Sequence, residues 1–129
     1  MLCLACILEG QGDVASIPVI IRRIAHDLNV FDLVVQTYRV HRQAIVRAGE
    51  LERAIERAAR SMRGDGGILI VLDADDDLPC ELGPSLSARA RQAPRPAQRL
   101  HPPLTAAAVR SEMRRGRRSR PGPRTRACT

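Results

Sequence analysis

The sequence contains no lysine and no tryptophan, and it has only one phenylalanine and one tyrosine. All 21 basic residues are therefore arginines. A P-loop for nucleotide phosphates needs a lysine, so this class of phosphate-binding site is excluded. The absence of lysine beside many arginines, alanines and prolines is typical of a GC-rich gene.

The amino terminus lacks the features of a targeting or membrane-spanning segment. No basic residue precedes the apolar run 1–8, and Glu9 ends this run. The run is too short for a signal peptide or a transmembrane helix. We therefore expect a soluble, cytoplasmic protein with no membrane partner.

Charge divides the chain into two parts. Residues 1–92 hold 11 arginines against 13 acids, whereas residues 93–129 hold 10 arginines against one acid. The second part is rich in proline and alanine, and it has too few large apolar residues to offset the entropy lost on ordering. We predict one α/β domain over 1–92 and a disordered tail over 93–129, in which only 104–115 could form a helix.

Within 1–92, strand patterns alternate with helix patterns. The first helix is capped by Asp13 or Ser16, and its apolar residues recur at helical spacing: Val14, Ile17, Ile20, Ile21, Ile24 and Leu28. Strands are predicted over 2–8, 33–40 and 67–72, and the other helices over 49–63 and, after breaks at Pro79 and Pro84, 85–91. This strand–helix–strand–helix–strand–(helix) order predicts a parallel sheet with flanking helices.

An acidic cluster follows the most apolar of these strands. The run 67–72 reads as a strand buried on both faces, and four acids come directly after it: Asp73, Asp75, Asp76 and Asp77. Clustered carboxylates repel each other unless a cation neutralises them, and oxygen ligands suit Mg²⁺. A solvated loop with an aspartate helix cap remains the alternative. An EF-hand loop is excluded because Leu78 and Pro84 replace its glycine and its final glutamate.

The first strand also ends in an acid, since Glu9-Gly10 follows the run 2–8. The first and third strands of a doubly wound sheet are commonly neighbours, and ligands bind at the carboxyl ends of such strands. We therefore expect Glu9 to lie beside Asp73 and Asp75, which share one side of the chain if it stays extended.

A strand ending in Glu-Gly, a helix and a later strand ending in Asp-x-Asp resemble the Toprim domain. This domain is the metal-binding fold of topoisomerases, bacterial primases and overcoming-lysogenization-defect nucleases. The stretches 7–10 and 66–83 look similar to an uncharacterised bacterial Toprim-like family, and the resemblance covers residues 4–92.

The resemblance implies Mg²⁺-dependent phosphodiester chemistry on nucleic acid, as in a nuclease or a phosphotransfer enzyme, beside an ATPase partner. Asp73 and Asp75 would bind Mg²⁺ or Mn²⁺, and Glu9 would be a further ligand or a general acid/base. We add Asp77 as a candidate ligand of a second ion. The alternative is a non-catalytic binding or assembly module, or an inactive truncated remnant.

The chain departs from this resemblance after Gln92, where similar proteins should continue into an apolar strand and a helix with further acids and aromatics. An arginine- and proline-rich stretch stands there instead. We hypothesise a frameshift that leaves the sheet without an edge strand, and a nucleic-acid-binding arm is the other interpretation. An exposed sheet edge in so small a domain also predicts self-association.

Two further patterns have a structural interpretation. Cys3 and Cys6 form a C-x-x-C, but side chains three apart on a strand point to opposite faces, so we predict buried thiols rather than a zinc or redox site. Several arginines outside the tail are interpreted as exposed charge, with contact to nucleic-acid phosphates as the alternative: Arg22, Arg23, Arg39, Arg42 and Arg47.

Overall fold

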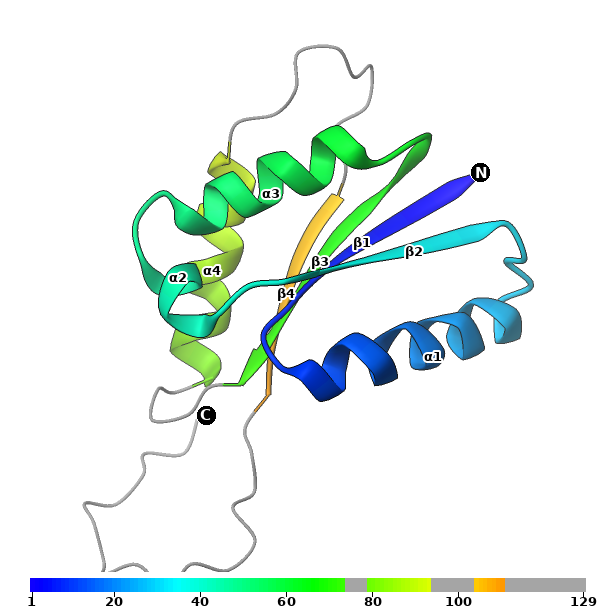
Figure 1. Ribbon diagram of the computed structural model, residues 1–129, viewed down its shortest axis with the longest axis horizontal. Coiled ribbons are helices and arrows are strands. Elements are labelled where there is room, and N and C mark those ends of the chain that lie inside the picture. The colour runs from blue at the N-terminus through cyan, green and yellow to red at the C-terminus, as the bar shows by residue number, and fades with distance from the viewer. Residues whose placement is uncertain (74–78, 94–103, 111–129) are drawn as a thin grey trace, which may run out of the picture.

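The protein folds around one parallel sheet, and the computed structural model describes residues 1–73, 79–93 and 104–110 (Figure 1). The elements follow the order β1 (Leu2–Leu8), α1 (Gln11–Asp27), β2 (Leu33–Arg39), α2 (Arg42–Val46), α3 (Glu50–Ser61), β3 (Asp65–Asp73), α4 (Pro79–Gln92) and β4 (Leu104–Arg110). The strands lie in the order β2-β1-β3-β4, and every neighbouring pair is parallel. The predicted α/β class is confirmed.

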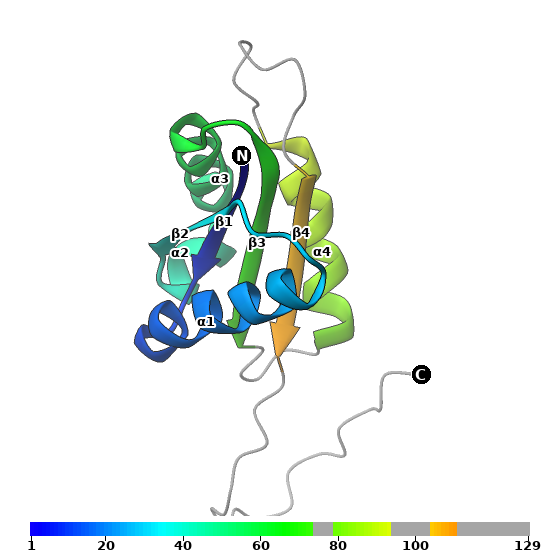
Figure 2. The same ribbon diagram turned by 90° about the vertical axis from the view of Figure 1, so that its right-hand side faces the viewer.

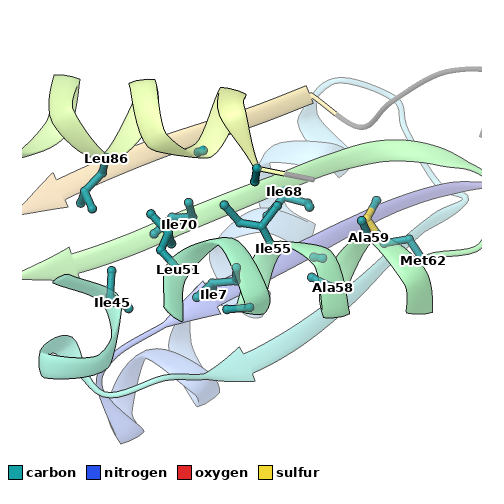
Figure 3. Close-up of a cluster of buried hydrophobic side chains, with 14 of the residues drawn as sticks. Ile7, Ile45, Leu51, Ile55, Ala58, Ala59, Met62, Ile68, Ile70 and Leu86 are labelled. Atoms are coloured by element: carbon teal, nitrogen blue, oxygen red, sulfur yellow. The ribbon is translucent and has the colours of Figure 1, made fainter. Parts of the chain in front are cut away.

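The larger core fills one face of the sheet, beneath α2, α3 and α4 (Figure 3). Ile7 of β1 and Ile68 and Ile70 of β3 meet Leu51 and Ile55 of α3, and all five are buried. Their spacing of two on the strands and four on the helix puts each set on one face, which explains why these segments adopt their elements. Glu56 and Arg60 form an ion pair on the outside of α3, with Oε1 and Nη2 2.6 Å apart.

The opposite face of the sheet carries a smaller core under α1, on the other side of the strands from α3 and α4 (Figures 1 and 2). Val14, Ile17 and Ile21 pack against it. Other residues of the predicted apolar spacing are exposed: Ile20 by 50%, Ile24 by 53% and Leu28 by 69%. Among the described residues, α1 is the only helix on this face, and one helix covers too little of a four-stranded sheet to enclose its whole apolar side.

The start of α1 differs from the prediction. The helix begins at Gln11 with Gly10 as its N-cap, and no side chain caps it. The amide groups of Asp13 and Val14 both donate to the carbonyl of Gly10, at 3.2 and 3.3 Å. Asp13 thus lies inside the first turn, where a negative charge favours the helix dipole without acting as a cap.

The segment 104–110 corrects the prediction for the second part of the chain. Leu104–Arg110 form strand β4, which extends β3 in parallel from Gly67–Leu104 to Asp73–Arg110, rather than a helix. Its central alanines favour a helix in isolation, but pairing with an open sheet edge outweighs local propensity. The expectation that the sheet lacks this edge strand is therefore wrong.

Two helices were missed or misjudged. The short helix α2 has too few residues for an apolar period to be recognised. Helix α4 begins at Pro79 and contains Pro84, which the sequence predicted as a break. Leu86 and Ala90 of α4 are buried in the larger core, and this packing stabilises the helix despite the proline.

Candidate metal centre

The site is built where β1 and β3 end. Leu8 pairs with Arg39 of β2 on one side and with Val71 of β3 on the other, so these three strands finish at the same edge of the sheet. Glu9 follows β1 directly, and Asp73 is the last residue of β3. The parallel order therefore gathers these side chains at the carboxyl edge, where open α/β sheets bind ligands.

A hydrogen bond joins the two predicted acidic positions. The backbone N–H of Asp73 donates to Oε2 of Glu9 over 3.2 Å, although the residues are 64 positions apart. This contact holds the Glu9 carboxylate over the end of β3 and leaves its other oxygen available to a cation. The expected closeness of Glu9 and Asp73 is confirmed, and it follows from the neighbouring positions of the first and third strands.

Asp75, Asp76 and Asp77 lie outside the described residues, so the predicted roles of Asp75 and Asp77 stay predictions. Within the described ranges, no three His, Cys, Asp or Glu side chains are grouped as a metal site. Glu9 and Asp73 nevertheless fit Mg²⁺ chemically, because this ion is often held by one or two carboxylates together with waters and substrate phosphates.

Arg39 lies at the same end of the sheet, and the sequence named it only among five arginines interpreted as exposed charge, with contact to nucleic-acid phosphates as the alternative. Its Nε donates to the backbone oxygen of Glu9 over 3.3 Å, and its Nη1 donates to Oε1 of Gln11 over 3.0 Å. These contacts tie the end of β2 to the turn between β1 and α1. Glu9 therefore contacts both neighbouring strands, through its carbonyl on the β2 side and its carboxylate on the β3 side.

Asp13 is a further acid that the sequence treated only as a helix cap. Its side chain is just 8% exposed, and a methyl group added to Gly10 would come within 3.0 Å of its Oδ2. Asp13 therefore lies back against the turn that carries Glu9. Asp13 follows Glu9 by four residues, across a turn with two glycines, and this spacing is the sequence signal that could have identified it as a further acid near the site.

A second charged cluster lies away from this edge, between α3 and α4. Nε and Nη2 of Arg89 donate to the two carboxylate oxygens of Glu52, at 3.0 and 3.2 Å. Arg89 also donates to the backbone oxygens of Ile45 and Arg47, at 3.1 and 2.8 Å. The hydrogen bond from Arg89 holds the pKa of Glu52 below its ordinary value of 4.5. Here arginine neutralises the acid, and the cluster locks three helices together.

The two cysteines of the C-x-x-C lie on opposite faces of the sheet, as predicted. Cys3 belongs to the larger core and Cys6 to the smaller one, and both are buried free thiols. Burial, and secondarily Cys3, raises the pKa of the Cys6 thiol to about 11. A buried, protonated thiol is a poor metal ligand and a poor nucleophile, so this pair is structural.

Comparison of the chain with protein-family models, curated proteins and solved structures gives no significant match. The assignment of the site therefore depends on its own geometry. In the described part of the chain, no helix combines the length and the apolar character that crossing a bilayer requires.

Proposed function

We propose that this chain is a Toprim-like protein that carries out Mg²⁺-dependent phosphodiester chemistry on nucleic acid. The observation that carries the proposal is the hydrogen bond between the Glu9 carboxylate and the Asp73 amide. It unites a Glu-Gly strand end with an Asp-x-Asp strand end at the carboxyl edge of a parallel sheet. These are the two motifs on which the Toprim resemblance depends.

In this proposal Asp73 and Asp75 hold Mg²⁺, Mn²⁺ replaces it, and Asp77 contributes to a second ion. The metal supplies charge stabilisation at a phosphate oxygen. Glu9 completes the coordination or exchanges a proton with the attacking or leaving oxygen, because its carboxylate is fixed beside Asp73. As the resemblance implies, an ATPase would be the protein partner and nucleic acid the substrate.

The test is metal-dependent cleavage of single-stranded and plasmid DNA by the full chain. We expect cleavage with Mg²⁺ or Mn²⁺, none with a chelator, and a rate at least about a hundredfold lower for Glu9→Gln. The control is Glu52→Gln, which removes an equally charged side chain bound to Arg89 and should keep the activity. A wild-type chain that cleaves nothing, or a Glu9→Gln variant as active as wild type, contradicts the proposal.

A non-catalytic binding or assembly module is the second candidate, and the outer side of α1 favours it. Ile20, Ile24 and Leu28 are at least half exposed, and Phe31, 72% exposed, packs edge-on against His26 of the helix. Exposed groups of large apolar side chains often mark interaction sites. A wild-type chain that does not cleave DNA but self-associates would favour the binding or assembly module.

A further inference from the structure

The position of Arg39 adds a phosphate-binding residue to the proposed site. Its guanidinium is anchored on the backbone oxygen of Glu9, the same residue whose carboxylate reaches Asp73. The guanidinium of Arg39 and the carboxylate of Glu9 are thus held at one turn, and Asp73 is bonded to that turn through its backbone N–H. The acids suit the metal, and the arginine suits the anion that the metal would act on.

The contacts of Arg39 leave its charge available. Both of its acceptors, the Glu9 carbonyl and the Gln11 amide oxygen, are neutral. It forms no ion pair with a carboxylate of the described residues, whereas Arg89 is neutralised by Glu52. The guanidinium is exposed and has more N–H donors than these two bonds use. Its planar fork matches two phosphate oxygens.

The anchoring also fixes where this charge lies. Arg39 is the last residue of β2 and pairs in register with Leu8, so it stands one strand away from Glu9 on the side opposite Asp73. An exposed arginine without such contacts would lose more side-chain entropy when it binds a ligand. The hydrogen bonds to the Glu9–Gln11 turn already restrict the Arg39 side chain in the free protein, so less entropy is lost when a ligand binds.

We propose that Arg39 is a positioning residue that binds a non-bridging oxygen of the phosphodiester on the β2 side of the Glu9–Asp73 pair. The inference depends on the proposed function for its substrate class. It goes beyond that function by assigning substrate affinity to a residue outside the acidic motifs. Arg39 takes no part in proton transfer and is no metal ligand.

The experiment is calorimetric binding of a thymidine dinucleotide, which carries one phosphodiester, to the full chain in Mg²⁺. We compare wild type with Arg39→Gln and with Arg63→Gln, whose exposed arginine lies between α3 and β3 at the other end of the strands. Both variants remove one charge, so the background from the arginine-rich segment is the same. We expect affinity about tenfold or more lower for Arg39→Gln, unchanged affinity for Arg63→Gln and partial recovery for Arg39→Lys.

Mn²⁺ binding by the same variants separates binding of the phosphate from damage to the site. It should equal wild type in Arg39→Gln if the arginine contacts only the anion. Equal dinucleotide affinity in wild type and Arg39→Gln, or no binding by wild type, overturns the inference. Arg39-dependent binding without hydrolysis contradicts only the proposed function. Hydrolysis with an unchanged KM in Arg39→Gln contradicts only the role of Arg39.

Discussion

The carboxyl edge of the sheet and the contact between α3 and α4 each bring a glutamate to an arginine, with opposite results. Arg89 donates two N–H groups to the Glu52 carboxylate, which neutralises the acid and lowers its pKa. Arg39 donates to the Glu9 carbonyl instead, while the Glu9 carboxylate accepts a backbone N–H of Asp73. The same residue types thus stabilise helix packing in one region and leave charge for ligands in the other.

The largest expected difference between the two regions is in the free energy of unfolding when each arginine is replaced by methionine. Arg89→Met should cost about 1–3 kcal/mol of unfolding free energy, because a part-buried carboxylate and the carbonyls of Ile45 and Arg47 lose their hydrogen bonds from Arg89. The lower half of this range is expected because about a quarter of each side chain is exposed and screened by solvent. Arg39→Met should change the free energy by no more than about 0.5 kcal/mol, since its neutral acceptors are accessible to water.

Urea unfolding of the two variants at neutral pH measures both values. Equal losses of unfolding free energy in the two variants would contradict the proposed difference, because Arg39 would then stabilise the fold as Arg89 does. A negligible loss in Arg89→Met would show that the α3–α4 contact does not depend on its ion pair.

The pH dependence of the unfolding free energy tests the same difference between the two regions, and a smaller effect is expected. The pairing lowers the pKa of Glu52 below 4.5 in the folded chain, so the unfolded chain takes up this proton first as the pH falls. The contribution of Glu52 is complete above a pH of about 4.5 and is lost as the pH falls through the lower folded-state value. Glu52→Gln and Arg89→Met should therefore lose less stability than wild type between pH 7 and pH 3.

Unfolding by urea at successive pH values checks this prediction. An acid dependence in Glu52→Gln as steep as that of wild type would show that other carboxylates, rather than this pair, govern stability at low pH.

The sequence predicted the parallel sheet and the meeting of Glu9 with Asp73, because both follow from strand order alone. It named Arg39 as one of five arginines but could not place it beside Glu9, because the contacts of Arg39 require that β2 pairs with β1 in a particular register. The ion pair of Glu52 and Arg89 depends on how α4 packs against α3, which no local pattern records. The strand β4 was missed because Ala106, Ala107 and Ala108 favour a helix, and only an open edge of β3 makes the strand stable.

Asp13 shows a different reason for a missed residue. An acid at the start of a helix is often its N-cap, so the sequence predicted only a capping role for Asp13 and no role beside Glu9. Its burial against Gly10 appears only once α1 is seen to begin at Gln11. Local propensity therefore predicted the elements, whereas packing decided which of their charged residues meet.

The most direct measurement is calorimetric titration of Mn²⁺ and Mg²⁺ into the full chain, the Glu9→Gln/Asp73→Asn variant and Glu52→Gln. We predict saturable binding to wild type and to Glu52→Gln, and an affinity at least about a hundredfold lower in the double variant, which loses the two carboxylates of the site that the structure describes. Circular dichroism should show that all three are folded. Undetectable binding to folded wild type, or wild-type affinity in the double variant, would contradict a metal centre at the carboxyl edge.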